Sequence, residues 1–305
     1  MSDTVNDTIN NPPELELLRQ EAAEFGIELA AAPEWDRVTI DRTDGGVVSA
    51  IVWGADAPRA TFLHGGGLNA HTWNTTVLSG GWPAVALDLP GHGDSSWHDD
   101  VDYRAERLAG PVGEAIALLA PESEVVVGQS LGGLTAIALA AARPELVRRL
   151  VVIDASPGFV VAGGNQVRDF LAGPDSFASR DEIVDRALEF GFGPSRAAVE
   201  RGVLRNTRVR DDGRVVFKHH FANLTADSPL AMSADFTSLW PALESIEVPV
   251  LLVRGSRGFL NDELEQEFLA RTPGAVSVTI ESGHNVQEEA PVELVAALSE
   301  FLARS

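Results

Sequence analysis

Short apolar runs alternate with longer segments of helical period from Ala60 onward, and no other feature restricts the fold of the chain as much. The apolar runs read as strands over residues 60–63, 84–87, 125–127 and 150–153, and the segments between them include helical patterns over 103–119 and 131–142. Fully apolar strands separated by helices indicate a parallel sheet that is covered by helices on both faces. The sequence therefore predicts an α/β fold.

The alternation stops after Ser156 and resumes at Val248. The pattern is then completed by strands expected at 249–253 and 275–280 and by helices expected at 262–271 and 291–302. Residues 157–235, which are mostly helical, lie between the two parts. A helical insertion between two βα units emerges at the carboxyl ends of the strands. We therefore expect one core, residues 37–156 and 236–305, with a cap (lid) at 157–235, rather than an independent second domain.

Residues 1–36 are expected to form an acidic N-terminal extension. They carry many aspartates and glutamates against a single basic residue, Arg19, and their one helical pattern runs over 13–29. We expect a solvated extension rather than part of a site. Two β-rich segments follow, 37–40 and 47–53, and the Asp-Gly-Gly sequence between them predicts a hairpin.

The absence of cysteine narrows the chemistry open to the chain. Zero cysteines exclude disulfides, thiolate nucleophiles and metal–thiolate sites, so a covalent nucleophile has to be an oxygen or the amine of Lys218. Lysine and arginine together number 23, and aspartate and glutamate 45. The resulting net charge of −22 disfavours nucleic acid and anionic membrane surfaces as partners.

The N-terminal sequence and the lengths of the apolar runs bear on location. The chain does not open with a basic segment followed by an apolar run, and no run approaches the roughly 18 residues of a membrane span. We therefore expect a cytoplasmic protein. The sequence leaves open whether the chain forms a homo-oligomer.

A candidate nucleophile lies in Gly128-Gln129-Ser130-Leu131-Gly132, between an apolar strand and an alanine-rich helix. This strand–turn–helix setting is the one that a G-x-S-x-G nucleophile elbow requires. A serine held in a strained turn, with its hydroxyl exposed, needs residues without a Cβ atom two positions before and two after. Gly128 and Gly132 meet this need, so Ser130 is the predicted nucleophile.

A glycine-rich turn, His64-Gly65-Gly66-Gly67, ends the strand over 60–63. Glycines let a peptide N–H face a substrate without an intervening side chain. We expect the N–H of Gly66, or alternatively Gly67, to join the N–H of Leu131 in an oxyanion hole for acyl transfer. Without Ser130, a turn that merely ends a strand would be the preferred interpretation.

These two motifs, together with Asp88-Leu-Pro-Gly-His-Gly-Asp-Ser95 and Ser282-Gly-His284, resemble the α/β-hydrolase family. The resemblance covers about Arg37 to the C-terminus. It implies a mostly parallel eight-stranded sheet with helices on both faces and an inserted, mainly helical cap. It also implies the chain order nucleophile, acid, histidine, in which His284 matches the general base. Asp88 matches a turn where the family's aspartate is structural.

The triad acid departs from the commonest pattern of the family. Many relatives carry G-x-x-D after strand seven, but here Gly255-Ser-Arg-Gly258 has glycine in place of the aspartate. Asp154 ends the strand over 150–153, the strand-six position that some members use. We favour Asp154 because a carboxylate that orients an imidazole works best on a rigid strand end. Asp262, at the start of the following helix, is the alternative acid.

The expected function is a serine hydrolase that cleaves a carboxylic ester or lactone bond of a mid-sized hydrophobic substrate through an acyl-enzyme. No cofactor is implied, and the remaining histidines lack the spacing of a metal site. The substrate-binding candidates are Trp73, Phe159, His220, Phe221 and Val286. The enzymatic alternatives are a C–C bond (meta-cleavage product) hydrolase and a cofactor-free haloperoxidase-like enzyme. A ligand-binding receptor or pseudoenzyme is the alternative from another class.

Overall fold

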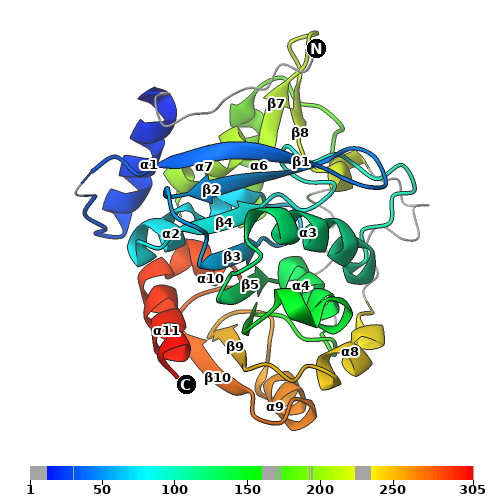
Figure 1. Ribbon diagram of the computed structural model, residues 1–305. Helices are drawn as coiled ribbons and strands as arrows, with labels where there is room; N and C mark the ends of the chain where they lie inside the picture. Colours follow the sequence, from blue (N-terminus) through cyan, green and yellow to red (C-terminus); the bar gives the residue numbers. More distant parts are fainter. Residues whose placement is uncertain are drawn as a thin grey trace.

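The computed structural model describes residues 12–29, 31–159, 170, 173–191, 193, 195–223 and 235–304. Within these residues, eight strands form one sheet in the order β1-β2-β4-β3-β5-β6-β9-β10 (Figure 1). The strands are β1 (Trp35–Asp41), β2 (Val47–Trp53), β3 (Ala60–Leu63), β4 (Ala84–Leu87), β5 (Val125–Gln129), β6 (Leu150–Ile153), β9 (Val250–Gly255) and β10 (Val276–Ile280). The predicted α/β fold with an eight-stranded sheet is confirmed.

This sheet is parallel from β4 to β10, and its β1–β2 and β2–β4 pairings are antiparallel. All residues of β3, β4, β5 and β6 are buried, which explains their unbroken apolar sequences. The predicted hairpin joins β1 to β2, and its glycines Gly45 and Gly46 have φ values of 93° and 82°, which side chains with a Cβ atom rarely adopt.

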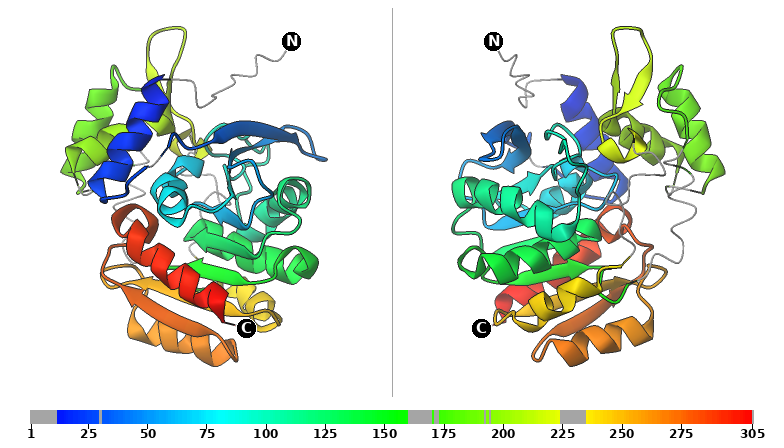
Figure 2. Two further views of the ribbon diagram at one scale, coloured as in Figure 1. Left: turned by 60° about the vertical axis from the view of Figure 1, so that its left-hand side comes forward. Right: turned by 90° about the vertical axis from the view of Figure 1, so that its right-hand side faces the viewer.

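Helices cover both faces of the sheet, as the two views of Figure 2 show. One face packs against α3 (Ala105–Leu119), α4 (Leu131–Ala142), α8 (Trp240–Glu244) and α9 (Asp262–Arg271). The other face packs against α2 (Asn74–Gly80) and α11 (Pro291–Ala303), with α10 (Val286–Glu289) leading into α11. The helices predicted at 103–119, 131–142, 262–271 and 291–302 match α3, α4, α9 and α11 to within two residues at each end. None of the described helices is long and apolar enough to cross a membrane.

Residues 157–235, which we call the inserted segment, lie between β6 and β9. Their described elements are α6 (Arg180–Glu189), α7 (Arg196–Asn206), the small hairpin β7 (Thr207–Val209) and β8 (Val215–Phe217), and the short helix η3 (His220–Asn223). Most of their described buried apolar side chains form a hydrophobic cluster of their own, whereas Phe159 and Phe221 belong to the cluster that contains α3 and α4. The inserted segment therefore has its own packing.

The N-terminal helix α1 (Pro12–Glu24) differs from the expected solvated extension. It ends earlier than predicted, because Gly26, in the left-handed region at φ 66°, turns the chain. Leu18 and Ala22 are fully buried and pack toward α2. The expectation of a solvated helix was wrong, because the acidic side chains pair with arginines of the inserted segment instead of facing only water.

Candidate active site

Ser130 lies in the turn between β5 and α4, with φ 52° and ψ −118°. Few residues other than glycine adopt this strained conformation, and it is sustained by tight packing around the turn. A Cβ atom on Gly128 would overlap the Gly132 backbone, and one on Gly132 would overlap the Leu63 carbonyl. The two glycines are therefore required by the close approach of three backbone segments.

Asp154 and His284 come together from the ends of β6 and β10. The His284 Nδ1 atom donates a hydrogen bond to Asp154 Oδ2 over 2.6 Å. Asp154 is fully buried, with φ 47°, and its Oδ2 atom also accepts a 2.7 Å hydrogen bond from the Phe259 N–H. Because the carboxylate accepts the hydrogen bond from Nδ1–H, that nitrogen keeps its proton and the imidazole Nε2 atom remains available as a base.

Asp262, the alternative acid, lies elsewhere. It is the first residue of α9, its side chain is 80% exposed, and it forms a 2.6 Å ion pair with Arg254. The described contacts join Asp154, and not Asp262, to His284. Gly258 explains the departure from the G-x-x-D pattern: a Cβ atom there would overlap both carboxylate oxygens of Asp154. Glycine at 258 leaves the space that the strand-six carboxylate fills.

Phe259 is a site residue that the sequence interpretation missed. Its ring stacks on the His284 imidazole, with centroids 3.7 Å apart and planes inclined by 19°. The Phe159 ring in turn stacks on the Phe259 ring, with centroids 5.3 Å apart. The imidazole is thus fixed by Asp154 through a hydrogen bond and by Phe259 through its face. Phe259 has no motif around it, so only the folded loop reveals its position.

The glycine turn is held by His64, which is fully buried. Its Nδ1 atom donates to the Gly65 carbonyl over 2.7 Å, and its Nε2 atom accepts a 2.9 Å hydrogen bond from the Leu89 N–H. Burial lowers the pKa of His64, so the ring is neutral at neutral pH, in agreement with this donor–acceptor pattern. Gly66, Gly67 and Leu131 all line the same cavity as Ser130.

Gln129 connects the serine turn to the histidine loop. Its Nε2 atom donates to the His284 carbonyl over 3.1 Å and to Asn285 Oδ1 over 3.3 Å. Two acceptors on one side require the amide nitrogen to face them. The residue before Ser130 therefore holds the backbone of His284 in register with the serine.

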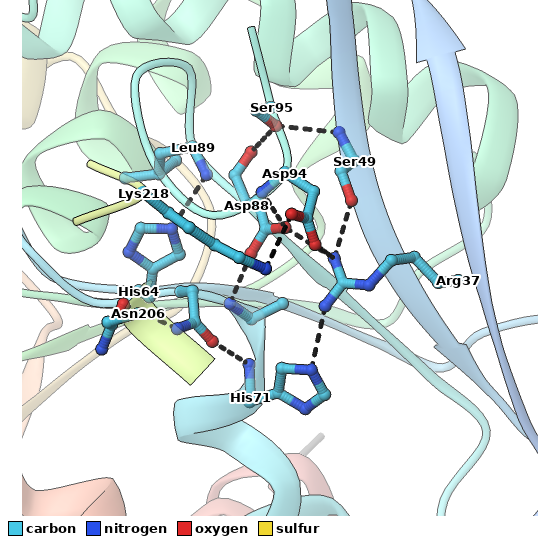
Figure 3. Close-up of polar contacts among 12 residues, drawn as sticks. Arg37, Ser49, His64, His71, Asp88, Leu89, Asp94, Ser95, Asn206 and Lys218 are labelled. Atoms are coloured by element: carbon cyan, nitrogen blue, oxygen red, sulfur yellow. Dashed lines mark hydrogen bonds and ion pairs between the residues drawn. The ribbon is translucent and has the colours of Figure 1, made fainter. Parts of the chain in front are cut away.

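Asp88 is the centre of a buried polar network beneath the glycine turn (Figure 3). It accepts hydrogen bonds of 2.7 Å from Arg37 Nη1 and the Ala70 N–H and of 3.0 Å from the Asp94 N–H. Burial acts to raise the pKa of Asp88, but Arg37 and the backbone donors outweigh it and lower the pKa. Lys218 of the inserted segment donates to Asp94 over 2.8 Å. These contacts fit a structural role for Asp88.

A cavity of about 760 Å³ contains Ser130 and His284 in its wall. Apolar side chains from the core and from the inserted segment line it: Leu134, Phe159, Phe170, Phe217, Phe221 and Phe259. Two of the predicted substrate-binding residues, Phe159 and Phe221, are among them. A cavity of this size and lining suits a mid-sized, largely apolar ligand.

Three of the predicted substrate-binding residues lie away from the described cavity wall. Trp73 is fully buried and packs on Phe62 at a centroid distance of 4.8 Å, and Val286 is fully buried in the cluster under α11. Both are held in the core because their helical positions face the sheet. His220 stacks on Trp97 at 4.2 Å, which turns its ring away from the cavity.

His219, the neighbour of His220, lines the cavity instead. His219 lies in the bend after β8 and His220 begins η3, so their rings lie in different surroundings, and the sequence did not show which of the two lines the cavity. His219 is 2% exposed, and burial lowers its pKa to about 4, so it is neutral at neutral pH. Among the described residues, no group of three or more histidine, aspartate and glutamate side chains could hold a metal ion.

Comparisons with known proteins agree with this geometry. The model of the alpha/beta hydrolase family matches residues 62–298. Esterase Rv0045c of Mycobacterium tuberculosis is 35% identical over 301 residues, which cover 95% of this chain and 96% of the relative. A solved structure of that esterase is similar with a TM-score of 0.83, at 34% identity, and covers 95% of this chain and 98% of that one.

A second curated relative is the pimeloyl-[acyl-carrier protein] methyl ester esterase of Aromatoleum aromaticum. It is 33% identical over 233 residues, which cover 72% of this chain and 87% of the relative. E-2-(acetamidomethylene)succinate hydrolase has a TM-score of 0.75 at 22% identity, covering 88% of this chain and 99% of that one, which bears on the fold alone. Ester cleavage is thus the named activity of two relatives that match most of the chain.

Proposed function

Because the chain belongs to the alpha/beta hydrolase family and is an ester-cleaving hydrolase, we propose that it acts through an acyl-enzyme on Ser130. The proposed triad is Ser130, His284 and Asp154, with the N–H groups of Gly66 and Leu131 as the oxyanion hole. The observation that carries it is the 2.6 Å hydrogen bond from His284 to the buried Asp154, with Ser130 and His284 lining one cavity.

In the proposed mechanism, His284 Nε2 takes the Ser130 hydroxyl proton while the serine oxygen attacks the ester carbonyl carbon. The oxyanion of the tetrahedral intermediate accepts hydrogen bonds from the two backbone N–H groups. His284 then gives its proton to the departing alcohol oxygen, and the carbon–oxygen bond breaks. Water then gives a proton to His284 and attacks the acyl-enzyme carbonyl carbon. The bond to Ser130 breaks, His284 returns its proton to the Ser130 oxygen, and the carboxylic acid leaves. Asp154 stabilises the imidazolium that forms in each half of the cycle.

We propose a neutral, mid-sized hydrophobic ester as the substrate. Aromatic and aliphatic side chains dominate the described cavity wall near Ser130, and the net charge of −22 disfavours polyanionic substrates. A lactone, which is a cyclic ester, would react by the same steps. The inserted segment contributes Phe217 and Phe221 to the wall, which supports a role for it as the cap.

The kinetics of Ser130→Ala test this proposal. The variant should lose on the order of a millionfold in kcat, as in other triads that lose a member. A panel of p-nitrophenyl esters and macrocyclic lactones compared on wild-type protein would define the substrate class. Near-normal turnover by Ser130→Ala would contradict the mechanism.

The expected cytoplasmic location of the protein remains a prediction that cell fractionation checks.

A further inference from the structure

The N-terminal helix α1 is joined to helix α7 of the inserted segment by a cluster of ion pairs. Arg205 pairs with Glu14 over 2.7 Å and with Glu21, and Arg201 pairs with Glu24 and, over 3.6 Å, with Glu21. The side chains of Arg205 and Glu21 are only 8% and 10% exposed. Pairs with so little contact with water are screened by salt much less than surface pairs.

The same helix is fixed to the core. Leu18 and Ala22 are buried, Leu18 belongs to the same hydrophobic cluster as Val77 of α2, and Asn74 donates a 3.1 Å hydrogen bond to Glu21. In Figures 1 and 2, α1 accordingly lies beside both α2 and the helices of the inserted segment. Helix α1 therefore bridges the two parts of the protein that are far apart in sequence.

This bridge also forms part of the cavity wall. Glu21, Glu24 and Phe25 line the cavity that contains Ser130, and so do Arg201 and Arg205. Phe25 follows directly on α1 and is half-buried. Residues of α1 and α7 thus together form one part of the cavity wall.

We propose that α1 is a specificity element of the esterase: its C-terminal end, with Phe25, limits the length of the ester chain, and Arg201 and Arg205 hold this wall closed. The proposal rests on the proposed function, because it assumes that the ester occupies this cavity. The part of the ester that extends toward α1 should therefore be short and uncharged, since carboxylates as well as Phe25 line the cavity here. Neither Phe25 nor the arginines take part in bond breaking.

The test is the ratio of kcat/KM for p-nitrophenyl decanoate to that for p-nitrophenyl butyrate. Phe25→Ala should raise this ratio roughly tenfold, because apolar pockets discriminate by about this much when space for a chain is gained. Arg205→Met should raise it as well, because it removes two of the four ion pairs that hold α1 against α7. The matched controls are Arg196→Met, whose ion pairs with Asp185 and Glu200 stay within the inserted segment, and Ile27→Ala, outside the cavity wall.

Exchanging the charges of Arg201 and Glu24 distinguishes a role of this ion pair in specificity from a role in stability alone. Arg201→Glu should raise the ratio, and the double variant Arg201→Glu with Glu24→Arg should return it toward the wild-type value, because the pair is rebuilt with opposite polarity. A structural brace alone would lower the melting temperature of these variants and leave the ratio unchanged, and that result would overturn the proposal.

Failure of this proposal is distinguishable from failure of the proposed function. Suppose that butyrate hydrolysis depends on Ser130 but that the ratio is unchanged in Phe25→Ala and Arg205→Met. This result would show that α1 does not determine specificity, and it would leave the esterase mechanism intact. If Arg205→Met does not fold, Phe25→Ala decides the question by itself, since it leaves all four ion pairs in place.

Discussion

Gly258 lies so close to Asp154 that any Cβ atom at position 258 would overlap the carboxylate. The glycine and the aspartate are therefore complementary: the loop after β9 lacks an acid and leaves room for the acid that follows β6. The backbone of the same loop donates the Phe259 N–H to Asp154 over 2.7 Å. Sequence positions that are about a hundred residues apart thus specify a single carboxylate site.

Asp154→Asn and Asp262→Asn should differ greatly in turnover. Loss of the Asp154 carboxylate leaves the imidazole without the group that fixes its tautomer, and kcat should fall roughly ten-thousandfold. Asp262→Asn removes an exposed ion pair to Arg254 and should keep kcat within about twofold of wild type. Steady-state hydrolysis of p-nitrophenyl butyrate measures both. A larger loss in Asp262→Asn would identify that residue as the acid.

Gly258→Ala should lower kcat by roughly tenfold to a hundredfold with little change in KM, because the added methyl group displaces the Asp154 carboxylate and not the ester. Gly255→Ala is a poor control, since a Cβ atom there also overlaps backbone. Gly110→Ala is better, because a Cβ atom at 110 meets nothing within 4 Å. An unaltered kcat in Gly258→Ala would show that the loop shifts to accept the methyl group and leaves the Asp154 carboxylate in place.

Phe259→Leu should lower kcat by about fivefold, since the ring that covers one face of His284 is lost and an aromatic contact of this kind contributes about 1 kcal/mol. Phe259→Tyr keeps the ring and should retain most of the activity. Leu118→Ala, at a side chain that is 67% exposed on α3, serves as a control for removing a surface hydrophobe. Equal activity of the Leu and Tyr variants would argue against a role for stacking.

The buried His219 should make the protein less stable in mild acid. Its pKa is about 4 in the folded state and near 6.5 when the chain is unfolded, so between these values the unfolded chain binds a proton that the native state does not. Stability is therefore complete above pH 6.5 and falls as the pH drops toward 4. At pH 5 the loss from this group is roughly 2 kcal/mol.

His219→Phe removes this contribution, so urea unfolding at pH 7 and pH 5 should show a smaller difference for the variant than for wild type. Burial also lowers the pKa values of His64 and His92, so part of the acid sensitivity should remain in the variant. An identical pH dependence of the two proteins would mean that His219 is protonated in the native state.

The strands and the serine turn could be predicted from the sequence because their signals are local. A run such as residues 150–153 is apolar throughout because every one of its residues is buried, and the glycines around Ser130 follow from the sterics of one turn. The predicted oxyanion-hole residues and His284 likewise lie at strand ends in short motifs. These features depend on a few consecutive residues each.

The remaining features depend on contacts between distant segments. Trp73 and Phe159 are both large and apolar, and only the folded chain shows that one packs in the core and the other in the cavity wall. The acidic residues of α1 suggested solvation, yet their partners, Arg201 and Arg205, are far along the sequence. Phe259 and His219 carried no motif, because packing alone gives them their positions.

Labelling with a fluorophosphonate probe, followed by intact-protein and peptide mass spectrometry, tests the acyl-enzyme on Ser130 most directly. The triad predicts one adduct per chain on the peptide that contains Ser130, much slower labelling of Asp154→Asn, and no adduct on Ser130→Ala. Unlabelled wild-type protein, or an adduct that persists in Ser130→Ala, would contradict Ser130 as the nucleophile.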